Sequence, residues 1–145
     1  MAKIEEFLSS SEEAEIIEAI QKAEKATSGE IRVHIENEVA DDPISHAEKV
    51  FYSLKMENTK DRNGVLIYMA VKSKVFVIYG DKAINDAVPK GFWDGIKDVM
   101  QAHFKQNFFK DGIVEGIEKA GEQLKKFFPW TADDKNELPD EISKS

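Results

Sequence analysis

The chain has 145 residues, no cysteine and a formal net charge of −8, from 20 Lys and Arg against 28 Asp and Glu. This length is typical of a single domain with one hydrophobic core. The acidic balance disfavours general binding to nucleic acid or anionic lipid, and the lack of cysteine excludes disulfides, a Cys nucleophile and thiolate metal sites.

Two amphipathic segments begin the chain. A helix is predicted from Ser10, which has capping-box spacing to Glu13, and its apolar residues recur at helical spacing until Thr27-Ser28-Gly29 ends it. Glu30 to Glu36 then alternates between apolar and polar residues. This period predicts a strand near a sheet edge with one face at least partly wet.

A second helix is predicted from Asp42-Pro43, followed by two apolar strands over 65–71 and 75–79. Three residues separate these strands, so they form an antiparallel hairpin, and both are expected to be buried on two faces. The first two strands are joined through a helix and can run parallel. A short helical turn over 83–88 and two helices over 92–108 and 113–127 follow.

This element order predicts the α/β class, as a three-layer α/β/α sandwich with a small mixed β-sheet. We expect residues 1–130 to form a single domain. Residues 131–145 carry many acidic and few apolar side chains, which predicts a disordered C-terminal tail.

The topology brings three polar segments to one edge of the sheet. If the first two strands are parallel and the third is antiparallel to the second, then Ser28-Gly29-Glu30, Asp61-Arg62-Asn63-Gly64 and Gly80-Asp81 meet there. Oxygen ligands of this kind suit calcium or magnesium. Turn chemistry and surface ion pairing explain the same residues without a ligand. Asp111 is a further acid, expected to cap the last helix.

Four motifs occur in order: Thr27-Ser28-Gly29-Glu30-Ile31-Arg32-Val33, Arg62-Asn63-Gly64-Val65-Leu66-Ile67-Tyr68, Val77-Ile78-Tyr79-Gly80-Asp81, and Phe109 to Ile117. Together they resemble the TPM domain family over residues 10 to 128. The family takes its name from a plant thylakoid lumen protein, a cyanobacterial photosystem repair protein and a nematode receptor modulator.

The resemblance implies an α/β/α sandwich that binds a divalent cation and, in the plant member, has acid phosphatase activity. The positions that match the family's acidic and polar motifs are Glu30, Asp61, Asn63, Asp81 and Asp111. Many relatives have a signal peptide and a membrane span or Gly-rich tail. This chain has no segment of either kind, so we expect a cytoplasmic protein without a membrane span.

Three hypotheses follow. The first is a monomeric module that binds calcium or magnesium at Glu30, Asp61, Asn63 and Asp81, with Asp111 as a further ligand, and organises loops for a protein partner. The second is a metal-assisted phosphomonoesterase at the same site, with Arg62 facing the phosphate. The chain has no familiar phosphatase motif. The third is an interaction domain that holds no metal.

Overall fold

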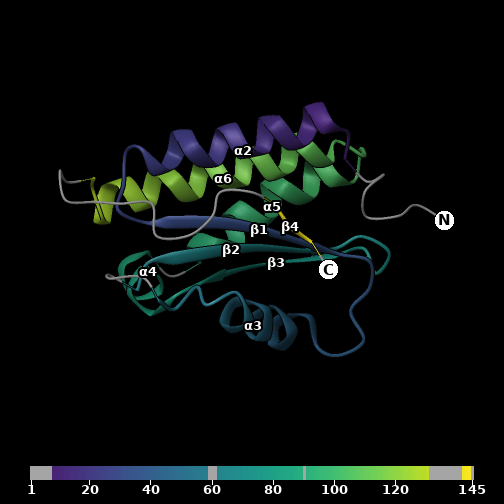
Figure 1. Cartoon of the computed structure of the whole chain (residues 1–145), viewed down its shortest axis with the longest axis horizontal. Coiled ribbons are helices and arrows are strands. Elements are labelled where there is room, and N and C mark those ends of the chain that lie inside the picture. The colour runs from purple at the N-terminus through teal and green to yellow at the C-terminus, as the bar shows by residue number, and fades with distance from the viewer. Residues whose placement is uncertain (1–7, 59–61, 90, 131–141, 145) are drawn as a thin grey trace.

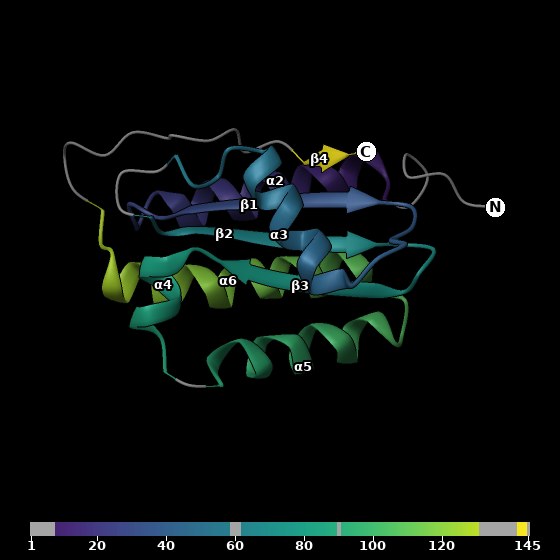
Figure 2. The same cartoon turned by 90° about the horizontal axis from the view of Figure 1, so that it is seen from below.

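The computed structural model describes residues 8–58, 62–89, 91–130 and 142–144 as three layers built around a mixed sheet. Strand order is β3-β2-β1-β4. Helices α2, α5 and α6 cover one face and α3 covers the other (Figures 1 and 2). The predicted α/β/α sandwich is therefore confirmed. The elements are α2 (Ser10–Glu24), β1 (Glu30–Glu36), α3 (Pro43–Ser53), β2 (Gly64–Ala70), β3 (Val75–Gly80), α4 (Lys82–Ala87), α5 (Phe92–Phe104), α6 (Phe109–Phe127) and β4 (Ser143–Lys144).

Helix α2 begins with a capping box one residue earlier than the sequence predicts. The Glu12 amide donates to Ser9 Oγ at 3.1 Å, and the Ser9 amide donates to Glu12 Oε1 at 3.0 Å. The pair predicted at Ser10 and Glu13 is wrong, because three consecutive serines allow the same spacing in two registers.

The central pairing is parallel between β1 and β2 and antiparallel between β2 and β3, as predicted. Every residue of β2 is buried, whereas four of the six residues of β3 are only half-buried. The prediction that both strands are buried on two faces is therefore wrong for β3. Strand β3 is at the edge of the sheet, where it has a neighbouring strand on one side only.

Helices α2 and α6 pack against each other with almost no intervening side chain. A Cβ atom added to Gly121 of α6 would lie 2.9 Å from Cβ of Ala23 on α2. Ile20 from α2 and Ile117 from α6 are fully buried in the same core cluster as Ile31 of β1. Close helix contact thus allows both helices to reach the sheet.

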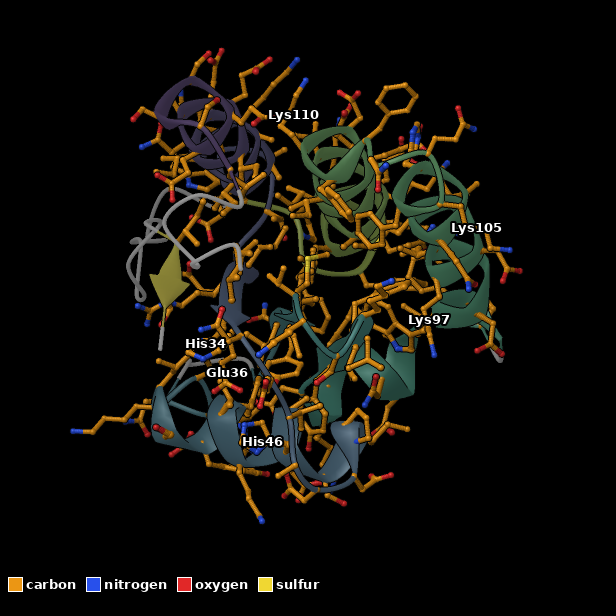
Figure 3. All side chains as sticks on the ribbon, turned by 90° about the vertical axis from the view of Figure 1, so that its right-hand side faces the viewer. His34, Glu36, His46, Lys97, Lys105 and Lys110 are labelled. Carbon is orange, nitrogen blue, oxygen red and sulfur yellow. The ribbon has the colours of Figure 1, made fainter. Side chains whose placement is uncertain are left out.

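The face of β1 toward α3 is partly wet, as predicted, because Arg32 and Glu36 are only half-buried, whereas Glu30 and His34 are buried. His34 is 4% exposed, and its Nε2 atom lies 3.1 Å from Glu36 Oε1. Glu36 Oε2 accepts a hydrogen bond from the Tyr68 hydroxyl at 2.6 Å and lies 2.9 Å from His46 Nε2 of α3. Figure 3 shows His34, Glu36 and His46 gathered between β1 and α3. This network allows His34 to be buried on the polar face of β1.

A short strand, β4, pairs with β1 in the region predicted to be a disordered tail. Residues His34 and Ile35 pair with Ser143 and Lys144, and the Ser143 hydroxyl lies 2.9 Å from His34 Nδ1. Ile142 packs on the core. Residues 142–144 are thus described as part of the sheet and the core, whereas 131–141, on which most of the predicted disordered tail falls, lie outside the described residues.

Among the residues that the structure describes, none of the helices combines the length and apolar character needed to cross a bilayer.

The α2–α6 contact predicts opposite effects for two glycine substitutions. Gly121→Ala should lower the free energy of unfolding by about 1–3 kcal/mol, because the added methyl group forces two packed helices apart. Gly95→Ala on α5 is the matched control, since its Cβ would meet nothing within 4 Å. That variant should be more stable by about 0.5–1 kcal/mol. Urea unfolding measures the free energy of unfolding of both variants. Equal changes in the two variants would contradict the packing argument.

Burial of His34 predicts a specific pH dependence. Desolvation lowers the pKa of His34 below its ordinary value of 6.5, against the opposing effect of Glu36. As the pH falls, the unfolded chain therefore binds a proton at this histidine before the folded chain does. The stabilisation that His34 contributes to the folded state is thus present above the unfolded pKa and is lost as the pH falls. Lowering the pH from about 7.5 to about 5.5 should narrow the stability gap between wild type and His34→Gln, by at most about 1.4 kcal/mol per pH unit.

Urea unfolding of wild type, His34→Gln and the control His103→Gln at both pH values measures this gap. His103 is suitable because its side chain is 33% exposed. A gap that widens as the pH falls would contradict the assigned direction.

Candidate functional site

The described residues of the three polar segments predicted to meet at one edge of the sheet do so. Glu30 pairs with Gly64 at the start of β1 and β2, and Val65 pairs with Gly80 at the end of β3. The Asp81 amide donates to the Gly64 carbonyl at 2.8 Å. We call this edge, with Thr27, Glu30, Asn63 and Asp81, the strand-start edge.

Polar side chains are buried here to an unusual extent. Of the five buried polar or charged residues in the described part of the chain, four are at the strand-start edge: Thr27 at 2%, Glu30 at 2%, Asn63 at 0% and Asp81 at 3% exposure. Removing a carboxylate or amide from water is costly unless another group replaces its hydration. Their partners therefore decide what this edge can do.

Asn63 is only partly satisfied. Its Nδ2 atom donates to Ser28 Oγ at 3.2 Å, whereas its fully buried Oδ1 atom has no hydrogen-bond partner within the described chain. Nearby, the Thr27 hydroxyl donates to the Phe128 carbonyl and accepts from the Gly29 amide at 3.0 Å. The threonine is thus satisfied, and the asparagine presents an amide oxygen that can accept a cation or a donor.

Asp81 forms a fork-shaped ion pair with Arg62. Arg62 Nε donates to Asp81 Oδ2 at 2.8 Å, and Arg62 Nη2 donates to Oδ1 at 3.0 Å. The Lys82 amide also donates to Oδ1, at 2.7 Å, so Asp81 caps α4. The carboxylate raises the pKa of the Arg62 guanidinium. Oδ2 accepts one bond and retains a lone pair for a further ligand.

A further carboxylate near this pair was missed by the sequence reasoning. Glu57 lies close enough to Arg62 to raise its pKa, and Glu57 Oε2 is buried without a hydrogen-bond partner among the described residues. Glu57 falls in the polar connection after α3, where neither spacing nor a turn motif distinguishes it from its neighbours.

Two of the predicted ligands are not placed at this edge. Asp61 lies outside the described residues. Asp111 is in the first turn of α6, with Phe108 as the N-cap residue, so the prediction that Asp111 caps this helix is wrong. The end of α6 adjoins the strand-start edge, where the Ser28 amide donates to the Phe128 carbonyl at 2.9 Å. Asp111 lies about 25 Å away along the helix.

Within the described ranges, no three His, Cys, Asp or Glu side chains are arranged as they stand to hold a metal ion. A cation at the strand-start edge would therefore use the Asn63 amide oxygen and backbone carbonyls together with carboxylates. Such mixed oxygen sets are ordinary for calcium and magnesium. These oxygen ligands suit a hard cation. The carboxylates would have to move closer together than they are in this structure to bind one.

Comparisons with known proteins agree on the fold. The BA42 protein from the psychrophilic bacterium Bizionia argentinensis is 58% identical, with 100% of each chain covered and a TM-score of 0.92. The N-terminal domain of a protein from P. gingivalis is 21% identical over 81% of this chain and 76% of its own, with a TM-score of 0.67. The N-terminal domain of cg2496 from Corynebacterium glutamicum is 15% identical over 81% and 74%, with a TM-score of 0.64. These last two show similarity of fold alone.

None of the curated proteins matches this chain. A model of the TPM domain, by contrast, matches residues 2–123. That match covers most of the chain, including all three segments of the strand-start edge. The chain therefore belongs to the TPM domain family.

Proposed function

We propose that this protein binds a divalent cation, calcium or magnesium, at the strand-start edge. The observation that carries the proposal is Asn63 Oδ1, an oxygen that is fully buried and has no hydrogen-bond partner in the described chain. An amide oxygen in that position is a ready ligand for a hard cation, and binding would offset the cost of its burial.

The carboxylates beside Asn63 supply the charge that such a site needs. Glu30 and Asp81 belong to adjoining strand ends and are almost fully buried, and the sequence places Asp61 two residues before Asn63. Calcium takes six to eight oxygen ligands in flexible geometry, so backbone carbonyls and water would complete the set.

Arg62 sets the energetic condition for binding. Its guanidinium occupies both oxygens of Asp81, so a cation must either share Asp81 through Oδ2 or displace the arginine. The Arg62 side chain is 47% exposed, which lets it move into water at modest cost. If the arginine is displaced, the metal ion replaces the Arg62 guanidinium as the partner of Asp81.

The phosphomonoesterase alternative assigns a different role to the same arginine. That reaction would require Arg62 to face a phosphate, whereas its guanidinium is bonded to Asp81. Cation binding requires only that the ion share the Asp81 carboxylate through Oδ2 or displace Arg62 from it. We therefore propose cation binding, with a protein partner engaged through the loops at this edge, ahead of phosphate hydrolysis.

Calcium and magnesium titrations followed by amide chemical shifts test this function. We expect the amides of Gly29, Asn63 and Gly64 to shift on titration. Asp81→Asn should weaken binding about tenfold or more, because it removes a charged ligand. Asp86→Asn is the matched control, since it makes the same chemical change at an exposed position of α4. Shifts elsewhere, or equal affinities for the two variants, would contradict the proposal.

A further inference from the structure

A recess lies at the opposite end of the sheet from the strand-start edge. It has a volume of about 370 Å³ and lies between the turn that joins β2 to β3 and the connection from α5 to α6. Its apolar wall includes Val71, Val75, Phe76, Phe104 and Phe109. We call it the hairpin-end cavity. Its volume is within the range of small-molecule sites, which are also mostly apolar.

The walls of the hairpin-end cavity are held in place by both connections. Lys74 and Asn107 have φ angles of 56° and 64°, so each tight turn is set by a residue in the left-handed region. Backbone hydrogen bonds close the two turns, from Lys74 to Val71 at 3.3 Å and from Asn107 to Phe104 at 3.0 Å. The Phe76 and Phe104 rings meet edge to face with centroids 4.9 Å apart. A ligand would find this shape already formed.

The charge at the rim is the reverse of that of the whole protein. Lys74 and Lys105 line the hairpin-end cavity, and none of the Asp and Glu residues that the structure describes does. Neither lysine forms an ion pair with a described residue, in contrast to Lys72, which lies 3.0 Å from Glu38. In a chain of net charge −8, two lysines without a local counter-ion favour an anion over a cation.

We propose that the hairpin-end cavity binds a small amphipathic anion, a carboxylate carried on a short hydrocarbon body. The hydrocarbon would be buried against the valine and phenylalanine side chains, and the carboxylate would lie between Lys74 and Lys105 at the rim. Apolar burial supplies most of the affinity and the lysines select the sign of the head group. The recess is bounded by two closed turns, which favours a compact ligand over an extended peptide.

Octanoate is the probe that tests this site, with octanol and octylammonium as matched neutral and cationic ligands. In amide-detected titrations at millimolar concentrations, octanoate should shift Val71, Phe76 and Phe104 in a saturable manner. Octanol should bind more weakly and octylammonium weakest. If octanoate leaves these amides unshifted, or if octylammonium binds as well as octanoate, the proposal is overturned.

Removal of the rim charges gives the second test. The double variant Lys74→Asn, Lys105→Gln should bind octanoate about three- to tenfold more weakly, as expected for two exposed ion pairs. Asparagine tolerates the left-handed conformation at position 74. The control is Lys97→Gln, which removes a charge from α5, the helix that Lys105 caps at its C-terminus, at a residue that does not line the cavity (Figure 3). If the single control lowers the free energy of octanoate binding by half as much as the double variant, or by more, the loss is a net-charge effect and the assigned site is overturned.

Discussion

The parallel pairing of β1 with β2 is the constraint on which the rest of this domain depends. Seven residue pairs, from Glu30 with Gly64 to Glu36 with Ala70, fix the two strands in one direction and one register. Because a short turn then reverses the chain, the end of β3 returns to the start of β2. The domain therefore has two unlike ends, one with buried polar side chains and one with the apolar hairpin-end cavity.

Two polar side chains of the sheet, Glu36 and Asn63, differ in how completely their hydrogen bonds are satisfied. Glu36 contacts Tyr68, His34 and His46, so its burial is accounted for within the fold. At the strand-start edge, Asp81 is matched by Arg62, but Asn63 Oδ1 is not matched by any described group. A complete network stabilises one structure, whereas an incomplete one leaves capacity for a ligand. The proposed cation site rests on this difference.

Sequence patterns predict the layers of this fold well because each pattern depends on residues that are close together in the chain. The link of three residues between β2 and β3 allows only a hairpin, and the crossover through α3 allows the parallel pair. The strand-start edge followed from that topology, since it depends only on strand direction. What the sequence could not supply is side-chain pairing across long separations. The bond between Arg62 and Asp81, and the burial of His34 under α3, depend on rotamers and on helix placement.

Two further features depend on contacts between residues that are distant in the sequence. Asp111 was grouped with the other acids by composition and motif, but α6 runs antiparallel to β1 and places its first turn at the far end of the sheet (Figure 1). Strand β4 was missed because two residues, Ser143 and Lys144, are too short to show a period. Their pairing depends on the exposed edge of β1, which no local pattern in the tail reports.

Helix α6 has a consequence for how the domain unfolds. Gly112, Gly116 and Gly121 are buried in it, and an added Cβ would meet Phe104, Met100 and Ala23, respectively. Each glycine lowers the intrinsic helix stability by about 1 kcal/mol relative to alanine, so α6 is a poor helix in isolation. It exists because α2 and α5 hold it. Loosening either neighbour should therefore melt α6 as well, which makes these three helices one cooperative unit.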